Sequence, residues 1–321
     1  MMKWGIMGTG RIANVFCETL KNMEDMQIYA IGSRNIDKAE SFADKFNAAK
    51  HYGSYEEFVC DKDIDVIYVA TPIAYHYEHV KLCLNAGKHV LCEKAFTMCA
   101  EEAKELFAIA KHNQLFLMEA LWTKCQPVYR KMMEWKEQGL LGDIQGVEAK
   151  FYTAGGNDHR LYKDKKQGGA LYDLAIYPLM YACAFLGYQP KKIFAHAVID
   201  GDDVDVMDSI QLVYENGAFA DLTAGLSCRR QASLYIHGSK GRVLIDEEHF
   251  YKAQSAILYS VNNEVIDGIE APFEISGYEY EAMEVKDCIE KGKTGSNLIP
   301  MEETIAIIGL LEDIKNMLTN S

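Results

Sequence analysis

A glycine-rich turn near the amino terminus carries the first residues whose spacing suggests chemistry. The segment Gly8-Thr9-Gly10-Arg11-Ile12-Ala13 follows a short apolar run and precedes an amphipathic stretch, which predicts a strand, a turn and a helix. Gly8 permits the tight turn, and Gly10 lets the backbone approach a pyrophosphate at the positive end of the helix. The pattern favours a dinucleotide site over a turn that binds nothing. The expected contacts in this turn are Gly8, Thr9, Gly10, Arg11 and Ile12.

The end of the second predicted strand determines which dinucleotide is expected. Enzymes that use NAD usually place Asp or Glu there for the ribose hydroxyls, whereas this chain has Ser33 and Arg34. Arg34 can stack on adenine and pair with a 2′-phosphate, to which Ser33 can donate a hydrogen bond. The alternative is a solvated arginine at a helix start. We therefore expect NADP as the cofactor, with NAD as the second possibility.

The elements that must position these residues alternate regularly over the first part of the chain. Apolar runs predict strands at 4–7, 28–32, 65–70, 89–92 and 115–118, and amphipathic patterns predict helices at 11–22, 36–46, 75–86 and 101–111. Continuous rather than alternating apolar runs are typical of a parallel sheet covered on both faces. Residues 1–121 are therefore predicted to form a doubly wound Rossmann domain of the α/β class.

The remaining residues, 122–321, have a different pattern. Strands are predicted at 147–153, 193–199, 209–214, 218–226, 233–237 and 243–245, and helices at 170–185, 277–291 and 302–318. Asn216-Gly217 between two of these strands favours a hairpin turn. We expect an α+β domain for substrate binding and oligomerisation, with a large, mostly antiparallel open sheet. One face of that sheet is expected to be semi-polar, which suggests a homodimer through it.

The composition limits the possible partners. The chain has 321 residues, of which 49% are hydrophobic, and a formal net charge of −14. A surface this negative repels phosphate backbones and anionic headgroups, so no nucleic-acid or membrane partner is expected. The nine cysteines are dispersed and form no CxxC pair, which favours a reducing compartment. Without an expected signal peptide or membrane helix, the predicted location is the cytoplasm.

Five further motifs are spread over most of the chain. They are Val69-Ala70-Thr71-Pro72 followed by His76, the segment 86–94 ending in Glu93-Lys94, the segment 118–123 with Trp122, the segment 168–177, and the run that begins at Gly277. Together they resemble the Gfo/Idh/MocA oxidoreductase family, and most closely its dimeric dihydrodiol dehydrogenase branch. Because they cover most of the chain, they are more specific than the glycine turn alone.

The resemblance implies roles for residues at the carboxyl edge of the first sheet. It places Lys94 beside the nicotinamide and the substrate, where a cation would stabilise the alkoxide involved in hydride transfer. Glu93 and Lys94 are implied as cofactor contacts. Further implied cofactor contacts are Thr71, Pro72, His76 and Trp122. The family usually has proline after Glu-Lys, but this chain has Ala95, and a cis bond before alanine costs about 2.5–4 kcal/mol.

Asp173 and Tyr177 complete the expected catalytic set. They are four residues apart on a predicted helix, so both project from one face. The dihydrodiol branch resembles this chain in having tyrosine where most of the family has histidine. A phenol has a pKa of about 10, and a nearby ammonium lowers it toward a useful range. We expect Tyr177 to donate or accept the proton and Asp173 to orient it or to bind a substrate hydroxyl, with a core tyrosine as the alternative.

Two further sets of polar residues are candidate ligand sites, one for the substrate and one for a metal ion. Asn157, His159 and Arg160 lie in a loop that by resemblance closes over the substrate, although a solvated basic loop is an equally good interpretation. His76 and His79 have HxxH spacing, but no third ligand lies nearby. Where many relatives carry a second acid, this chain has Met180. No metal site is therefore expected.

The leading interpretation is an enzyme that moves a hydride between NADP(H) and a hydroxyl or carbonyl carbon of a sugar, polyol or cyclic diol. One alternative is a non-catalytic regulator that senses dinucleotides on the same fold, although Lys94, Asp173 and Tyr177 speak against it. Another is redox-assisted glycoside cleavage with tightly held NAD, although Arg34 favours NADP.

Overall fold

The computed structural model describes residues 1–153, 169–200, 203–226, 232–245 and 250–319. It divides into two compact units. The first unit consists of Met1–Cys125 and Glu274–Ile305, and the second of Gln126–Phe273 and Ala306–Ser321. The chain therefore returns to the first unit after building most of the second. The predicted boundary at residues 121 and 122 did not include this return and stays a prediction.

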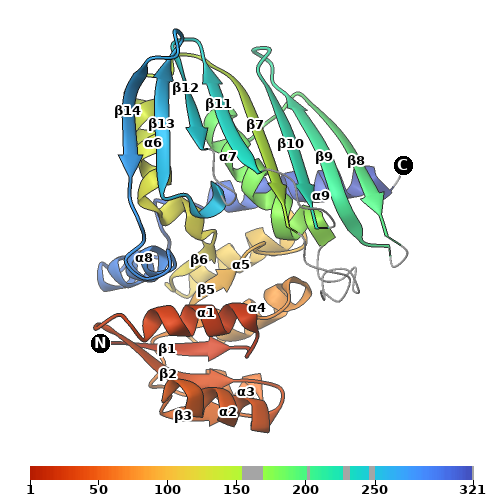
Figure 1. Cartoon of the computed structure of the whole chain (residues 1–321). Coiled ribbons are helices and arrows are strands. Elements are labelled where there is room, and N and C mark those ends of the chain that lie inside the picture. Colours follow the sequence, from red (N-terminus) through yellow and green to blue (C-terminus); the bar gives the residue numbers. More distant parts are fainter. Residues whose placement is uncertain (154–168, 201–202, 227–231, 246–249, 320–321) are drawn as a thin grey trace. The chain divides into compact units, whose positions relative to one another are not determined.

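The first unit is built on a six-stranded, fully parallel sheet in the order β3-β2-β1-β4-β5-β6 (Figure 1). Its strands are β1 (Met2–Met7), β2 (Met26–Gly32), β3 (Lys50–Tyr52), β4 (Val66–Val69), β5 (His89–Glu93) and β6 (Leu117–Ala120). The strand order reverses between β1 and β4. Open α/β sheets bind ligands at such a switch point, beyond the carboxyl ends of the strands.

Helices connect these strands as the doubly wound fold requires. They are α1 (Arg11–Leu20), α2 (Ile36–Phe46), α3 (Tyr55–Val59), α4 (His76–Asn85) and α5 (Ala100–His112), with a short 3₁₀ turn η1 (Ile73–Tyr75) before α4 and another, η2 (Trp122–Cys125), after β6. The apolar face of α1 packs on the sheet, where Phe16 stacks on Tyr68 of β4 at a ring separation of 4.0 Å. Helix α8 (Glu279–Glu290) also belongs to this unit.

The second unit contains an eight-stranded sheet in the order β14-β13-β12-β11-β7-β10-β9-β8 (Figure 1). Its strands are β7 (Ile144–Tyr152), β8 (Lys192–Ile199), β9 (Asp205–Val213), β10 (Phe219–Gly225), β11 (Ser233–Gly238), β12 (Gly241–Ile245), β13 (Ser255–Ser260) and β14 (Val265–Glu270). Only β7 and β10 pair in parallel, and the other neighbours are antiparallel. The expected mostly antiparallel sheet is confirmed.

One face of this sheet is buried against helices. Along β10, Ala220, Leu222 and Ala224 are buried, while Asp221 and Thr223 between them are partly exposed, as the alternation predicted. The helices of this unit are α6 (Pro127–Glu137), α7 (Ile176–Leu186) and most of α9 (Met301–Thr319), with a 3₁₀ turn η6 (Phe250–Lys252). In α7 every residue from Ile176 to Phe185 is buried.

The main local difference from the predicted elements lies at the start of the 170–185 helix. Its first part is a π-helical turn, η5 (Leu171–Ala175), and α7 follows directly. Such a turn uses bonds that span five residues instead of four and is often found at functional sites. Asp173 lies in η5 and Tyr177 in the first turn of α7, so the two predicted catalytic residues stand on different kinds of helix.

The sequence pattern did not predict several short or edge elements, namely β3, α3, α6, β13 and β14. It placed β6 two residues too early, at 115–118 instead of Leu117–Ala120. No helix within the described residues combines the length and the apolar character needed to cross a bilayer.

Candidate functional site

The glycine turn after β1 has the geometry that a pyrophosphate site requires. Gly8 has a φ of +109°, and a Cβ there would lie 2.8 Å from the carbonyl oxygen of Ala70 at the end of β4. Only glycine fits this position without strain. A Cβ on Gly10, the N-cap of α1, would meet no atom within 4 Å. A phosphate can therefore approach this backbone closely.

The first turn of α1 supplies donors for that phosphate. Its leading amides have no intrahelical acceptors, no side chain of the described residues caps them, and no acidic residue lies in the first turn. Arg11 is exposed at its first position. These residues fit the pyrophosphate of a dinucleotide, because helix amides and the helix dipole both favour an anion. Gly8, Thr9, Gly10, Arg11 and Ile12 thus lie where the sequence analysis expected them.

Aromatic side chains surround Arg34 after β2. Its guanidinium carbon lies 5.6 Å from the centre of the Tyr75 ring, and Arg34 is also close enough to Tyr55 to act on its pKa. Burial raises the pKa of Tyr55, and Arg34 opposes that rise. Ser33 is buried, and its hydroxyl accepts a bond from the Asn35 amide at 3.3 Å. The exposed Arg34 cation is thereby held in place at the carboxyl end of β2. Sequence analysis did not single out Tyr55 or Tyr75.

His76 is a buried link between two loops at the edge of the sheet. Its Nε2 lies 2.8 Å from the Thr71 carbonyl oxygen, and its Nδ1 lies 3.0 Å from that of Ala95. Burial lowers the pKa of His76, and the carbonyl contacts act in the opposite direction. Because His76 is only 1% exposed, its observed contacts join the Thr71 and Ala95 segments to each other. Its role as a cofactor contact stays a prediction.

His79 also contacts Thr71, but at the hydroxyl and not at the carbonyl oxygen that His76 contacts. Its Nδ1 lies 2.9 Å from the Thr71 hydroxyl oxygen, and burial, with His76 and Arg34 nearby, lowers its pKa to about 4. His79 is therefore neutral at physiological pH. The two histidines of the HxxH spacing bind different protein groups.

Lys94 follows the last residue of β5 and is partly buried. The Glu93 carboxylate accepts bonds from the Tyr68 hydroxyl and, at 3.2 Å, from the backbone amide of Lys94. The bond between Lys94 and Ala95 is cis, although Ala95 replaces the proline that the resemblance implies. Beyond it, the Phe96 amide donates to Oε1 of Glu119 at 3.0 Å. Hydrogen bonds from the backbone amides of Lys94 and Phe96 therefore fix the segment that carries the Lys94 side chain.

Two buried carboxyl groups of this region were missed by the sequence analysis. Burial raises the pKa of Glu119 to about 7, although bonds from the Thr304 hydroxyl and the Phe96 amide oppose the rise. Glu281 of α8 is fully buried, and among the described residues neither carboxyl oxygen has a hydrogen-bond partner. Burial and the nearby Glu93 raise its pKa well above the usual range. Only burial distinguishes these acids from surface acids, so no spacing rule could have found them.

Trp122, another expected cofactor contact, is buried in the first unit. Its ring stacks on Tyr278 at 3.9 Å with an angle of 4° between the planes. Tyr278 is the N-cap of α8. The stack therefore joins the segment after β6 to the start of this helix. A contact between Trp122 and the cofactor stays a prediction.

In the second unit, Tyr177 lies in an aromatic cluster. Its ring is 5.8 Å from Phe151 of β7 and 5.0 Å from Tyr251 of η6. Asp173 is partly exposed one turn earlier. The packing holds the Tyr177 ring firmly, while the hydroxyl is the only polar group of its side chain. Asn157, His159 and Arg160, the expected substrate contacts, lie outside the described residues.

Two family models match the chain. One, described as an oxidoreductase family with an NAD-binding Rossmann fold, matches residues 2–121, and the GFO/IDH/MocA C-terminal domain matches residues 129–244. The chain belongs to the GFO/IDH/MocA oxidoreductase family. It is therefore an oxidoreductase, and its first unit carries the NAD-binding fold of that family. The resemblance inferred from the motifs is confirmed.

Curated relatives cover nearly the whole chain. It is 33% identical to trans-1,2-dihydrobenzene-1,2-diol dehydrogenase of Mus musculus, over 98% of this chain and 96% of the relative. The Homo sapiens protein of the same name is 30% identical over the same shares. These relatives agree with the branch that the motifs indicated.

Solved structures share the fold of this family member. KijD10, a 3-ketoreductase from Actinomadura kijaniata in complex with NADP and TDP-benzene, is 24% identical with a TM-score of 0.86 over 98% of this chain and 97% of that one. An aldose–aldose oxidoreductase from Caulobacter crescentus complexed with glycerol is 21% identical with a TM-score of 0.87 over 99% and 98% of the two chains. At these identities the likeness establishes the fold alone.

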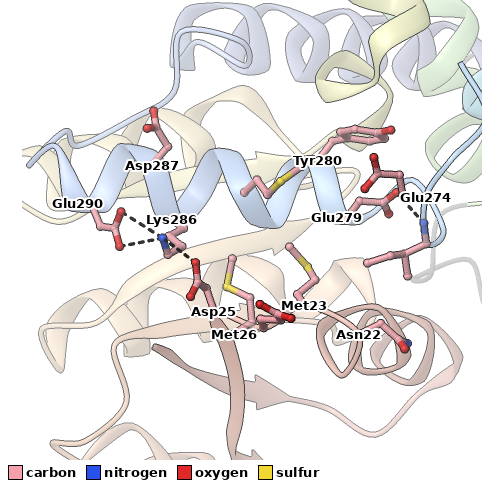
Figure 2. Close-up of a pocket in the computed structure, with 13 residues that line it drawn as sticks. Asn22, Met23, Asp25, Met26, Glu274, Glu279, Tyr280, Lys286, Asp287 and Glu290 are labelled. Carbon is pink, nitrogen blue, oxygen red and sulfur yellow. Dashed lines mark hydrogen bonds and ion pairs between the residues drawn. The ribbon is translucent and has the colours of Figure 1, made fainter.

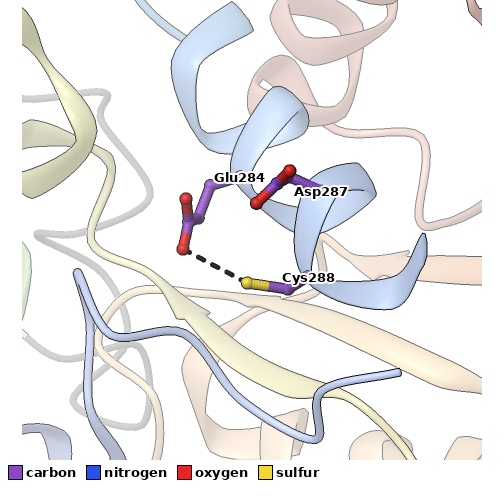
Figure 3. Close-up of side chains that lie close together, drawn as sticks. All are labelled: Glu284, Asp287 and Cys288. Carbon is purple, nitrogen blue, oxygen red and sulfur yellow. Dashed lines mark hydrogen bonds between the residues drawn. The ribbon is translucent and has the colours of Figure 1, made fainter. Parts of the chain in front are cut away.

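Glu284, Asp287 and Cys288 of α8 are close enough to share a metal ion, but each already has a protein partner (Figure 3). Glu284 accepts bonds from the Ser296 hydroxyl at 2.6 Å and from the Cys288 thiol, and Asp287 pairs with Lys291 at 2.7 Å. Burial and Glu284 raise the pKa of Cys288 to about 12. A protonated thiol is a poor ligand. The expectation that the protein needs no metal stays a prediction.

A cavity of about 570 Å³ lies between the α1–β2 connection and α8, away from the glycine turn (Figure 2). Lys286 pairs there with Asp25 and Glu290. The other acidic side chains of its lining are Glu24, Glu274, Glu279 and Asp287. Because carboxylates dominate the lining, this cavity does not suit an anionic cofactor.

Two carboxyl groups of β9, Asp205 and Asp208, are buried in the second unit. Asp205 pairs with Lys315 of α9 at 2.6 Å, whereas neither carboxyl oxygen of Asp208 has a hydrogen-bond partner within the part of the chain that the structure describes. Burial and the nearby Asp205 raise the pKa of Asp208 to about 8. Asp208 is therefore protonated in the folded protein at neutral pH.

Replacing Asp208 by asparagine is expected to stabilise the protein by about 1–3 kcal/mol more at pH 8 than at pH 5. In the unfolded chain Asp208 ionises near pH 4, but in the folded protein only near pH 8. The unfolded state binds fewer protons over this range, so the wild-type protein loses stability as the pH rises. Urea unfolding at both pH values measures the difference.

The control for this prediction is Asp221→Asn. Asp221 lies on the opposite face of the neighbouring strand β10 and is partly exposed. An Asp208→Asn protein whose free energy of unfolding differs from wild type by the same amount at pH 5 and pH 8 would contradict the prediction.

Proposed function

We propose that this protein transfers a hydride between NADP(H) and a hydroxyl or carbonyl carbon of a sugar, polyol or cyclic diol. The observation that carries the proposal is Lys94, which is fixed at the carboxyl end of β5 in the same unit as the glycine turn. The names of the relatives support the substrate class, since they include a diol dehydrogenase and an aldose–aldose oxidoreductase.

The residues divide the chemistry between them. When bound, NADP⁺ supplies the nicotinamide ring that accepts the hydride from the carbinol carbon. Tyr177 takes the hydroxyl proton during oxidation and returns it to the carbonyl oxygen during reduction. The Lys94 ammonium stabilises the negative charge on that oxygen. Asp173 orients the tyrosine or binds a substrate hydroxyl.

A substrate panel tests this proposal. Sugars, polyols, trans-diols and diketones are offered to the purified protein with NADP⁺ or NADPH, and absorbance at the nicotinamide band is followed. Reduction or oxidation of the cofactor with at least one class is expected. Cofactor binding without turnover across the whole panel would instead favour a dinucleotide-sensing regulator. Tightly held NAD that does not exchange would favour redox-assisted glycoside cleavage.

Replacing Arg34 by leucine is expected to weaken NADPH binding roughly 10- to 100-fold and to leave NADH binding nearly unchanged, because a charge-assisted bond to the 2′-phosphate is lost. Fluorescence titration with both cofactors measures the effect. The control is Lys38→Leu, which removes an exposed cation from the first turn of α2. Tighter binding of NADH than of NADPH by the wild-type protein would contradict the role of Arg34.

A homodimer through the eight-stranded sheet is part of the proposal. Exposed apolar side chains on that sheet support it, namely Phe194, Val198, Ile199, Phe219, Ile257, Val265 and Ile266. Such side chains commonly mark a protein interface. Light scattering should give twice the mass of one chain. We also propose a cytoplasmic location, which the eight free cysteines of the described residues support.

A further inference from the structure

The helix that carries Asp173 and Tyr177 begins against a buried carboxylate from a distant strand. The Leu171 amide donates to Oδ2 of Asp205 at 2.7 Å, although 34 residues separate them in the sequence. The opening amides of a helix have no acceptors within the helix. Asp205, which is 1% exposed, supplies one of these acceptors and places its negative charge at the positive end of the helix.

Lys315 and the backbone of Gly169 also lie against the Asp205 carboxylate. Its other oxygen, Oδ1, pairs with Nζ of Lys315 from α9 at 2.6 Å. On a third side lies Gly169, whose φ is +61°. A Cβ on Gly169 would lie only 2.5 Å from both carboxylate oxygens, so the backbone can approach Asp205 this closely only as glycine. The carboxylate is therefore held between a strand, a helix start and a lysine of a third element.

We propose that Asp205 and Lys315 are positioning residues, which fix the start of this helix and thereby the placement of Asp173 and Tyr177. The inference rests on the proposed function, in which those two residues act on the substrate. Leu171 is two residues before Asp173 and six before Tyr177. A shift of the helix start is therefore passed directly to both side chains. A misplacement of about 1 Å far from the reacting atoms can lower turnover on the order of 100-fold.

The π-helical turn explains why the bond from Leu171 to Asp205 is important for the start of the helix. Leu171 begins η5, whose hydrogen bonds are rare and less regular than those of an α-helix. The local sequence thus gives the helix start no strong preference for one geometry. The bond from Leu171 to Asp205 supplies that preference from another part of the fold.

The test compares Asp205→Ala and Lys315→Met with Asp208→Asn and Lys315→Arg. We expect the first two to lower kcat roughly 10- to 100-fold and to leave the Kd for NADPH unchanged, because the glycine turn and Arg34 lie in the other unit. Asp208→Asn changes an equally buried carboxyl of the same strand that does not bind the helix, so its kcat should stay within about twofold. Lys315→Arg should restore most of the lost turnover, since it keeps the cation.

Hydrogen exchange gives a readout that does not depend on activity. In Asp205→Ala, amides of the segment 171–177 should exchange roughly 10-fold faster than in the wild type, while those of α8 should not change. Unchanged exchange and a kcat within twofold in folded Asp205→Ala and Lys315→Met would overturn the proposal. An equal loss in Asp208→Asn would also overturn it, because the effect would then be general packing.

The failure of the proposed function has a different signature. If Tyr177→Phe keeps full turnover, Tyr177 has no role in the reaction, whatever the Asp205 variants do. If Tyr177→Phe loses turnover and the Asp205 and Lys315 variants keep it, only the positioning role fails.

Discussion

Replacing Tyr177 by phenylalanine should lower kcat by about 100-fold or more, because general acid–base catalysis commonly contributes about 10²–10⁴-fold. The substitution removes only the hydroxyl. The ring contacts with Phe151 and Tyr251 do not require it, so the fold should be retained. The Kd for NADPH should stay within about twofold of the wild-type value. Steady-state kinetics and fluorescence titration measure the two quantities.

Tyr181→Phe is the matched control. Tyr181 lies one turn further along α7, is also buried, and donates a bond from its hydroxyl to the Phe250 carbonyl oxygen at 3.3 Å. Both variants remove one buried hydroxyl from the same helix. We expect Tyr181→Phe to keep its kcat within about twofold. Equal kcat values for the two variants would remove Tyr177 from the mechanism.

Replacing Lys94 by methionine should lower kcat on the order of 100- to 1,000-fold, the usual effect of removing a group that stabilises a developing negative charge on oxygen. Methionine keeps most of the side-chain length without the ammonium. The backbone bonds on either side, from the Lys94 amide to Glu93 and from the Phe96 amide to Glu119, do not involve the ammonium. The local fold should therefore persist, as a thermal melt would verify.

A second lysine of the same strand region serves as the control. Lys88 precedes β5 at its amino end, and its ammonium donates to the carbonyl oxygens of Asp61 and Ile64. Lys88→Met should lower the melting temperature because it leaves these carbonyls unsatisfied. It should change kcat by less than about twofold. A kcat loss in Lys88→Met as large as that in Lys94→Met would show that the strand, and not the ammonium, matters.

The first sheet could be predicted because each strand carries its own signal. Runs such as Val66–Val69 are apolar throughout, and the glycine turn directly follows one of them. A parallel sheet buried on both faces requires such runs. Short elements such as β3 and α3 were missed, because three to five residues carry too little periodicity.

The packing of the chain could not be predicted in the same way. The helix over 277–291 was expected, but nothing in its pattern indicated that α8 would pack with the first unit. The parallel pairing of β7 with β10 likewise joins segments that are far apart in the sequence. An apolar face indicates that a helix or strand packs against another element, but it does not indicate which surface of the chain that element provides.

The residue types of the candidate site were determined by the sequence itself. Gly8, Gly10, Arg34, Lys94, Asp173 and Tyr177 belong to local motifs, and each motif specifies its own backbone and chemistry. Only the tertiary structure decided which other residues hold these site residues in place. His76 and Glu119 hold the segment around Lys94, and Asp205 binds the start of the Tyr177 helix. Burial and long-range hydrogen bonds give these groups their roles, and the spacing of residues along a chain predicts neither property.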